Sequence, residues 1–350
     1  MNAPQVDIII PVYNQPELTK KCLDSIAARQ DIPYRLIIID NANSPETKKL
    51  LNDLRSSHQN VRIVINKENA GWVKAVNQGM RLSESPYICI MNNDTVVKTD
   101  KWLSGLIKVA ETENTIGLVN PRFHIKKEAS CGEPYVEIDF CRGYCILIKR
   151  AVMNKIGWLD EDYGMGYYDD DDYSVRAIQE GFRCVRANDI IVEHLGDSTF
   201  SAVFGDARRR DLHQKNKELF YSKWGSRLKL LFIITKDAGR KELSDTMLSL
   251  ARKQHIVYMW NPKRVKCINH INVRERIVPA LARSVCLYLE LYLNKSRKGT
   301  KRFDMVFVED MKPSPEMLNM GTPVFNINFE KDGKRICEMA QAASRDKHAV

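Results

Sequence analysis

The sequence predicts an α/β protein with a mainly parallel central sheet. The first hundred residues contain four short apolar runs, and segments with the helical spacing of apolar residues separate them. Strands and helices that alternate at this spacing form βαβ units, whose strands are parallel. At 350 residues the chain is also long enough for two domains, each with its own core.

A helix start follows each of the first three predicted strands. The first apolar run begins at Val6 and we expect Pro11 to end it, after which Asn14-Gln15-Pro16-Glu17 opens a helix. Ser44-Pro45 starts the next helix, and a third is expected after Asn69-Ala70-Gly71-Trp72. The other three strands are predicted at 36–40, 61–65 and 87–91.

Two of these strands lead into a carboxylate, Asp40 and Asp94, and Asn14 is placed similarly after the first strand. The carboxyl edge of an open parallel sheet is where ligands bind. A hard cation held by one protein carboxylate and by substrate phosphates fits such a place. On its own, however, Asn92-Asn93-Asp94 is more typical of a turn that follows a strand.

Composition and missing motifs argue against several classes of protein. No Gly-x-Gly-x-x-Gly follows the first strand and no Walker lysine is present, which disfavours a dinucleotide-binding or P-loop enzyme. None of the nine cysteines forms a Cys-x-x-Cys pair, which disfavours zinc and a disulfide framework. Scattered cysteines, together with no signal-peptide pattern and no apolar run of membrane-spanning length, predict a cytoplasmic protein.

An acidic run at 169–172 precedes the helical pattern that resumes at Val175 and Ile178. Four consecutive aspartates repel one another, so some must be kept apart, bound to a cation or protonated. A helix N-terminus favours negative charge, but capping readily explains only one or two of them. Further on, the strand 190–194 ends at His194, and a lone histidine of this kind is more often structural than a ligand.

These features together resemble family-2 glycosyltransferases over roughly residues 1–200. The matching segments are 6–14, 38–40, Asn69-x-Gly71 with Asn77-x-Gly79, and Asn92-Asn93-Asp94. The resemblance implies a GT-A fold and a nucleotide-diphospho-sugar donor. It also implies that Asp94 binds the metal, because it matches the metal-binding position of the family's Asp-x-Asp motif.

The later motifs extend the resemblance to the catalytic residues. The spacing from the acidic run to Arg176 matches the family pattern and implies Asp170 as the general base. Asp169 and Asp171 are close competitors, because a poly-aspartate run permits a register error of one. His194 precedes a Gly and a Ser, as in a family element that completes the metal site. A divalent cation, Mn²⁺ or Mg²⁺, is the implied cofactor, and imidazole suits Mn²⁺ better.

The implied mechanism is a single displacement that inverts the anomeric carbon. Asp40 can accept the N3–H of uracil or thymine, and the pattern looks closest to rhamnosyltransferase-like members, whose donor would be a dTDP-sugar. Lys74 is a candidate phosphate contact, although an exposed helix lysine is the simpler interpretation. The implied donor-binding residues are Pro11, Tyr13, Asn14, Asp40, Asn69, Gly71, Lys74, Asn92 and Asn93. Those of the sugar and acceptor pocket are Gly143, Tyr144, Trp158 and Asp169.

A second α/β domain is predicted after a boundary at Gly225-Ser226. Its strands are expected at 228–234, 256–259, 303–308 and 323–329, with helices at 240–253, 275–294 and 332–344. The 226–350 segment loosely resembles the first half of a GT-B glycosyltransferase. The chain is therefore expected to be a fragment of a longer protein, or this domain to bind a partner or acceptor.

The charge of +10 lies in this second part. Residues 1–225 carry 30 basic and 31 acidic side chains, whereas 226–350 carry 24 and 13. The excess suggests phospholipid headgroups or nucleic acid as a surface partner, or simply a solvated face. The mostly apolar segment 277–293 has basic flanks that could seat it on anionic lipid, but a helix that covers the second sheet is the simpler interpretation.

Three functions follow from these observations. The first is an inverting transferase that acts on a cell-surface glycan or lipid-linked saccharide, in the cytoplasm or at the inner face of its membrane. The second is a catalytically silent GT-A module that binds nucleotide or glycan. The third, a nucleic-acid-binding protein, has no recognised module to support it, so no nucleic-acid partner is expected.

Overall fold

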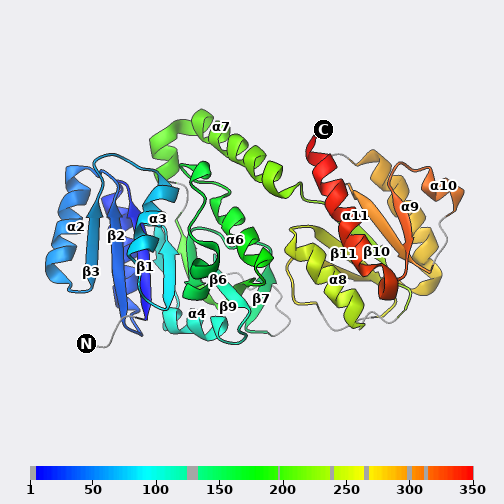
Figure 1. The fold of residues 1–350 in the computed structure, drawn as a ribbon, viewed down its shortest axis with the longest axis horizontal. Coiled ribbons are helices and arrows are strands. Elements are labelled where there is room, and N and C mark those ends of the chain that lie inside the picture. Colours follow the sequence, from blue (N-terminus) through cyan, green and yellow to red (C-terminus); the bar gives the residue numbers. More distant parts are fainter. Residues whose placement is uncertain are drawn as a thin grey trace. The chain divides into compact units, whose positions relative to one another are not determined.

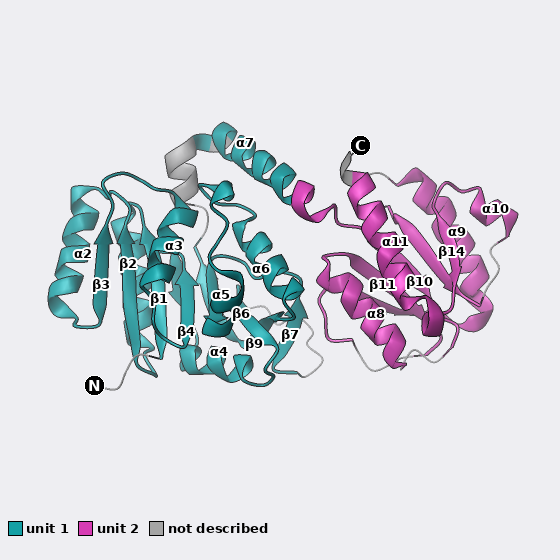
Figure 2. Cartoon of the chain, viewed as in Figure 1, with its two compact units in different colours: residues 1–220 teal, residues 221–350 magenta. Residues whose placement is uncertain are grey.

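The structure, a computed structural model, describes residues 5–123, 133–195, 198–236, 240–263, 268–297, 302–310 and 314–349. The chain forms two compact units, residues 1–220 and 221–350 (Figure 2). The border between them falls within helix α7 (Ser198–Trp224). In the part of the chain that the structure describes, no helix is both long enough and apolar enough to cross a membrane.

Unit 1 is built on one large sheet with the strand order β3-β2-β1-β4-β8-β6-β9-β5, in which β7 also pairs with β9 (Figure 1). The first four strands are parallel, as predicted. Beyond β4 the sheet is mixed, because β8 runs antiparallel to both β4 and β6. The strands are β1 (Val6–Val12), β2 (Tyr34–Asp40), β3 (Val61–Ile65), β4 (Tyr87–Met91), β5 (Thr95–Val97), β6 (Ile116–Arg122), β7 (Tyr135–Ile138), β8 (Cys145–Lys149) and β9 (Arg183–His194).

Helices cover both faces of this sheet. The main apolar core joins one face to α1 (Pro16–Ala28), α2 (Pro45–Ser57) and α4 (Trp102–Ala110). Helix α3 (Trp72–Leu82) packs on β1 so closely that a Cβ at Gly79 would lie 2.3 Å from Ile9 Cγ2. This contact explains the glycine of Asn77-x-Gly79, since any side chain there would separate helix from sheet. The other helices of the unit are α5 (Arg150–Ile156), α6 (Asp169–Gln179) and α7.

The prediction that Pro11 ends the first strand is wrong. Strand β1 continues to Val12, and Pro11 lies beside Ile39 of β2. The pairing of β1 with β4 reaches only Ile9. Pro11 is therefore tolerated, because a proline is compatible with a strand where no ladder bond has to be donated.

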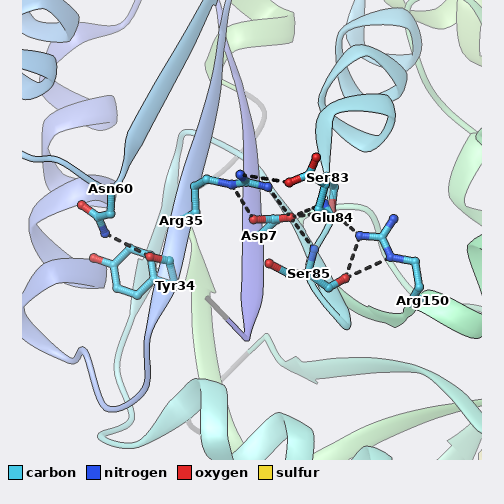
Figure 3. A network of polar contacts seen from close by, with 8 residues as sticks. All are labelled: Asp7, Tyr34, Arg35, Asn60, Ser83, Glu84, Ser85 and Arg150. Atoms are coloured by element: carbon cyan, nitrogen blue, oxygen red, sulfur yellow. Dashed lines mark hydrogen bonds and ion pairs between the residues drawn. The ribbon is translucent and has the colours of Figure 1, made fainter. Parts of the chain in front are cut away.

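At the start of β1, the buried carboxylate of Asp7 organises a polar network (Figure 3). Arg35 donates two hydrogen bonds to it, at 2.9 and 3.1 Å. The Ser83 hydroxyl at 2.7 Å and the backbone N–H groups of Glu84 and Ser85 at 2.8 and 2.9 Å complete the set. Because this network lies at the amino end of β1, it holds the sheet from the edge opposite to the carboxyl ends.

Unit 2 has a fully parallel five-stranded sheet with the order β12-β11-β10-β13-β14. Its apolar side chains form two clusters: one packs α8 and α11 on the sheet, and the other packs α9. The strands are β10 (Lys229–Ile233), β11 (Ile256–Asn261), β12 (Val273–Ile277), β13 (Met305–Glu309) and β14 (Val324–Ile327). The helices are α8 (Lys241–Arg252), α9 (Arg283–Ser296), α10 (Pro315–Leu318) and α11 (Phe329–Ala349). The short 3-10 turn η2 (Ala280–Ala282) precedes α9, and a similar turn in unit 1, η1 (Glu161–Tyr163), precedes α6.

The predicted helix at 275–294 is wrong in its first part. Residues Val273–Ile277 form edge strand β12, and α9 begins only at Arg283. The sequence Val-Arg-Glu-Arg-Ile carries three charged residues in succession, so its apolar pattern does not by itself indicate a strand. Parallel pairing with β11 fixes it in that conformation.

Candidate active site

The first cluster of candidate residues brings Asp94 and His194 together. Asp94 lies between β4 and β5, and His194 ends β9. Antiparallel pairing of β5 with β9 sets Thr95 opposite His194. As a result, Asp94 Oδ1 lies 3.0 Å from His194 Nε2, and Asn92 Nδ2 lies 3.2 Å from the same nitrogen.

This donor set fits a divalent cation. Two ligands at right angles and about 2.1 Å from one octahedral ion are about 3 Å apart, which is the spacing of the Asp94 oxygen and the His194 nitrogen. A carboxylate with an imidazole suits Mn²⁺ and tolerates Mg²⁺. Within the described residues, no group of three or more His, Cys, Asp and Glu side chains could hold a metal.

Aromatic packing fixes the orientation of the histidine ring. The rings of Tyr144 and His194 are stacked, with centroids 5.8 Å apart, and the Phe123 ring lies edge-on to both. The Tyr144 hydroxyl donates to the Pro121 carbonyl at 2.7 Å, and its backbone carbonyl accepts from Asn92 N–H at 2.9 Å. Tyr144 thus supports His194 and the Asn92 turn rather than presenting its hydroxyl to solvent.

The two asparagines of the triplet have different surroundings. Asn92 is half-buried beside His194. The Asn93 side chain is buried and donates to Thr19 Oγ1 of α1 at 2.9 Å. The side-chain amide of Asn93 therefore holds the turn against α1, and its role as a donor-binding residue stays a prediction.

The second cluster is the acidic run at the start of α6, whose members the fold separates. Asp172 is buried and pairs with Arg176 at 2.8 Å. Asp169 is buried and accepts the indole N–H of Trp72 at 3.1 Å. Asp170 is half-buried, and its Oδ2 accepts the backbone N–H of Gly143 at 2.7 Å.

Burial and mutual repulsion perturb two of these carboxyls. Desolvation, followed by the charge of Asp170, raises the pKa of Asp169 well above its ordinary value. Desolvation also raises the pKa of Asp170, while the N–H groups of Gly143 and Asp171 oppose the rise. A carboxyl whose pKa is raised by burial and by a neighbouring carboxyl is typical of a functional site.

A strained turn presents the acidic run. Tyr167 and Tyr168 have φ values of 69° and 67°, so two bulky residues in succession adopt the left-handed region. The buried amide of Asn216 in α7 donates to the carbonyls of Tyr163 at 2.8 Å and Gly166 at 2.7 Å. Helix α7 thereby holds the turn in a conformation that is costly for these residues and common at functional sites.

The dipeptide Gly143-Tyr144 joins the two clusters. Gly143 N–H holds Asp170, and the next residue, Tyr144, stacks on His194. Asn120 of β6 fixes the segment, because its amide bonds the carbonyls of Arg142 at 3.1 Å and Cys145 at 2.5 Å and accepts Arg142 N–H at 2.8 Å. The proposed metal ligands and the proposed base therefore belong to one site.

The third cluster surrounds Asp40 at the end of β2. Asp40 Oδ1 accepts both the backbone N–H and the side-chain amide of Asn43, at 3.0 and 2.7 Å. The Asn43 oxygen is hydrogen-bonded to the Asn14 backbone N–H, and Asn14 Oδ1 accepts Ser44 N–H at 2.8 Å. Asn14 has φ 55°, a conformation that asparagine tolerates better than most residues.

Asn41 links Asp40 to the Gly71 turn. Its side chain bonds Asn69 Oδ1 at 2.7 Å and accepts Ala70 N–H at 2.9 Å. Gly71 has φ 84°, and a Cβ there would lie 2.7 Å from Met165 Sδ. The glycine therefore allows the turn before α3 to touch the turn before the acidic run.

Several predicted residues lie outside these clusters. The Arg81 guanidinium carbon lies 4.6 Å from the centre of the Trp158 ring. Arg81 is in the last turn of α3, at the opposite end of that helix from Trp72. Lys74 is exposed. The hydrogen bond from Asn77 lowers the pKa of Glu161, desolvation opposes this effect, and the charge of Lys74 adds to the lowering. Pro11 is buried in β1 and Tyr13 is half-buried after it. We leave Trp158 and Lys74 out of the proposed pocket.

Sequence reasoning missed Trp72, Asn41, Asn43, Asn120 and Asn216. The first three lie within two or three residues of predicted positions, so proximity to a strand end was an available signal for them. Asn120 and Asn216 are isolated asparagines in a strand and a long helix, and their partners are set only by the tertiary fold.

Comparison with known proteins gives the family. The profile of Glycosyl transferase family 2 matches residues 7–159. Glycosyltransferase AglE of Haloferax volcanii is 31% identical over 207 residues, which are 55% of this chain and 67% of that protein. The chain belongs to glycosyl transferase family 2. This family 2 chain thus bears out the resemblance to the family that its strand-end motifs indicated.

Other relatives are matched over shorter lengths. An uncharacterised glycosyltransferase of Haemophilus influenzae is 23% identical over 131 residues, 37% of this chain and 40% of the relative. The poly(ribitol-phosphate) beta-glucosyltransferase of Bacillus spizizenii is 27% identical over 103 residues, 28% of this chain and 16% of the relative. The chain thus spans less than half the length of both relatives.

The fold of unit 1 also occurs in a solved glycosyltransferase. A mannosyltransferase from Pyrobaculum calidifontis superposes with a TM-score of 0.51 and 19% identity, over 63% of this chain and 64% of that one. The predicted GT-A fold of the family 2 domain is confirmed.

Proposed function

We propose that unit 1 transfers a sugar from a nucleotide-diphospho-sugar to an acceptor hydroxyl, with inversion at the anomeric carbon. The observation that carries this proposal is the Gly143-Tyr144 dipeptide: Gly143 bonds Asp170, and Tyr144 stacks on His194, which lies beside Asp94. Transfer from a diphosphate donor uses a base at the acceptor hydroxyl and a cation at the diphosphate, and this dipeptide contacts the residues proposed for both.

In this mechanism, one pair of residues acts at the leaving diphosphate and another residue acts at the acceptor hydroxyl. Asp94 and His194 would hold a divalent cation, which when bound neutralises charge on the leaving diphosphate. Asp170 accepts the proton of the acceptor hydroxyl as that oxygen bonds to the anomeric carbon. The bond from this carbon to the diphosphate breaks in the same step, and its electron pair leaves with the diphosphate. No covalent sugar–enzyme intermediate is needed.

Asp169 is proposed to line the sugar side of the same pocket. The Trp72 indole N–H holds it at 3.1 Å, and the raised pKa of Asp169 favours a neutral carboxyl that can donate to a sugar oxygen. Its buried side chain leaves Asp170, which is less buried, as the member that an acceptor can reach. This difference supports Asp170 over Asp169 as the base.

The proposed nucleotide end of the site is the Asp40 cluster. Asp40 accepts both hydrogen bonds from Asn43 through Oδ1, so we assign Oδ2 to the N3–H of a uracil or thymine base. The mannosyltransferase of like fold was solved with GDP-Man and Mn²⁺, which supports a nucleotide-sugar and a cation but not a pyrimidine. The base is therefore the part of the donor that an experiment must decide.

The proposed acceptor is a saccharide of a cell-surface or lipid-linked glycan. Among the relatives, the Bacillus spizizenii protein is named a glucosyltransferase of poly(ribitol phosphate), and one from Staphylococcus epidermidis, 28% identical over 120 residues, is named a teichoic acid polymerase. These names support a polyhydroxylated surface polymer as the class of acceptor.

The test is nucleotide release from a panel of UDP-, dTDP- and GDP-sugars, each with Mn²⁺, with Mg²⁺ and with EDTA. We expect release from a pyrimidine-nucleotide sugar that EDTA abolishes and added Mn²⁺ restores. Release that is equally fast in EDTA contradicts the metal-assisted mechanism. No release from any donor, with any acceptor saccharide present, favours a silent binding module instead.

A further inference from the structure

Helix α9 of unit 2 presents an apolar face to solvent. The α9 stripe, as we call it, includes half of the twelve exposed large apolar side chains in the part of the chain that the structure describes. Leu281 is 99% exposed, and Val285 and Tyr292 are each 62% exposed. The members are Leu281, Val285, Tyr288, Leu289, Tyr292 and Leu293.

The stripe is the outer face of a helix whose inner face is already packed. Leu287 and Leu291 are buried against the sheet of unit 2. Five members lie in α9 and recur at i, i+3, i+4, i+7 and i+8, which places them on one side of the helix, whereas Leu281 lies in the η2 turn that precedes α9. A helix on the surface of a soluble domain normally carries polar residues on that side, so this stripe indicates a contact that the chain alone does not make.

Basic side chains lie on the same side of the sheet as α9. Arg274 and Arg276 of β12 are paired in register with Tyr258 and Trp260 of β11, so they share a face with them. Trp260 belongs to the cluster that packs α9. The Arg274 guanidinium lies 5.3 Å from the Tyr258 ring and that of Arg276 5.8 Å from the Trp260 ring. Both arginines are exposed.

The charges on α9 itself do not oppose an anionic partner. Glu290, the acidic residue of this helix, is paired with Arg297. Lys295, one turn after Tyr292, is exposed. The segment 226–350 carries 24 basic and 13 acidic residues, so this part of the chain is positive overall.

We propose that the α9 stripe and its basic flank, Arg274 and Arg276, dock unit 2 on a bilayer that contains anionic lipid. An apolar helix face beside arginines lies in the plane of the interface, where the face enters the acyl boundary and the arginines reach headgroup phosphates. Tyr288 and Tyr292 suit this depth, because tyrosine prefers the interface between hydrocarbon and water. Helix α9 has 14 residues and extends over about 21 Å, too short to span a bilayer.

A second copy of the chain fits this surface less well. A two-fold axis through the stripe would bring the same patch of both copies together. Four arginines would then gather around an apolar contact, and their repulsion would oppose the dimer. A phosphate-bearing surface neutralises them instead.

The test is co-sedimentation of the full chain with phosphatidylcholine vesicles, with and without phosphatidylglycerol. We expect binding only to the anionic vesicles. The double variant Arg274→Gln, Arg276→Gln should lower the partition coefficient roughly 30-fold, since each basic residue near an anionic surface contributes about a factor of five. The variant Leu289→Ser, Tyr292→Ser should reduce binding to background.

Matched variants keep the test specific. Lys334→Gln with Arg335→Gln removes two exposed charges from α11, which packs with the other cluster of unit 2, and Ile65→Ser removes an exposed apolar side chain from unit 1. Both controls should bind as the wild type does. The proposal is overturned if the wild type ignores anionic vesicles, if the stripe variant still binds, or if the stripe instead supports a concentration-dependent dimer or DNA binding.

This surface does not depend on the proposed transferase activity. Nucleotide release from a water-soluble donor should be the same in the wild type, in the arginine variant of β12 and in the Leu289→Ser, Tyr292→Ser variant of α9. Loss of vesicle binding with release intact therefore tests the docking surface alone, whereas absent release with vesicle binding intact counts against the proposed function alone.

Discussion

The Asp170→Asn variant should lose transfer by a factor of about 10² to 10⁴, the usual contribution of a positioned general base. Asparagine can still accept the Gly143 N–H through its side-chain oxygen, so the geometry at 2.7 Å is retained. Donor binding should therefore persist while kcat falls. The measurement is the rate of sugar transfer together with the affinity for the nucleoside diphosphate.

Stability gives this variant an internal control. Because burial raises the pKa of Asp170, the ionised carboxylate destabilises the fold at neutral pH, and a neutral amide should leave Tm unchanged or raise it. A loss of activity with an unchanged or higher Tm is then a loss of chemistry. The Asp171→Asn variant tests the register. If it loses transfer while Asp170→Asn keeps it, the base has been placed one residue too early.

The pH dependence of kcat should report the same group. Since desolvation raises the pKa of Asp170, the acid limb of the profile should lie above the ordinary aspartate value of about 3.9. In Asp170→Asn, this limb should disappear from the residual rate.

The Asp7→Asn variant should lower the free energy of unfolding by about 3 kcal/mol, which is typical when one partner of a buried ion pair is removed. The Asp7 carboxylate accepts bonds from Arg35, Ser83 and two backbone N–H groups (Figure 3). An amide would point an N–H group at some of these donors and leave them without an acceptor. Urea unfolding measures the loss, and Asp24→Asn, in an exposed pair with Lys20, should change stability by less than about 0.5 kcal/mol.

Acid should remove the same contribution from the wild type. Burial opposes ionisation of Asp7, but its bonds to Arg35, Ser83, Glu84 and Ser85 outweigh burial and lower its pKa. A group with a lowered folded pKa contributes stability that is fully present above the unfolded value of about 3.9 and is lost as pH falls through the folded value. Unfolding free energies of wild type and Asp7→Asn should therefore converge below about pH 4. Curves that stay parallel well below pH 4 would contradict this role for Asp7.

Much of unit 1 could be predicted from local sequence. Strand and helix positions through Met91 follow from apolar periodicity, and Asp40 and Asp94 lie at strand ends because parallel strands share a carboxyl edge. The family resemblance added what periodicity could not, namely the choice of Asp170 within the acidic run as the proposed proton acceptor. The predictions for Pro11 and for the start of α9 were wrong, because pairing with a neighbouring strand, rather than local preference, decides the conformation there.

The supporting contacts of the site could not be predicted. Nothing in the sequence indicates that Asn216 would bond a turn some fifty residues earlier, or that Asn93 would face α1. The aspartates of the acidic run have different partners: Asp172 pairs with Arg176, Asp169 accepts from Trp72 and Asp170 accepts from Gly143. These partners come from three different parts of the chain. Such contacts are fixed by how the helices pack on the sheet.

The central claim is that Asp94 and His194 hold the cation on which the donor diphosphate binds. Electron paramagnetic resonance of Mn²⁺ bound together with UDP or dTDP measures this directly, because a ligating imidazole couples its nitrogen to the ion. We expect nitrogen coupling in the wild type, its loss in His194→Gln, and weak Mn²⁺ binding in Asp94→Asn, with the exposed Asp100→Asn as the control. Tight Mn²⁺ binding in Asp94→Asn, with no nitrogen coupling in the wild type, would contradict the account.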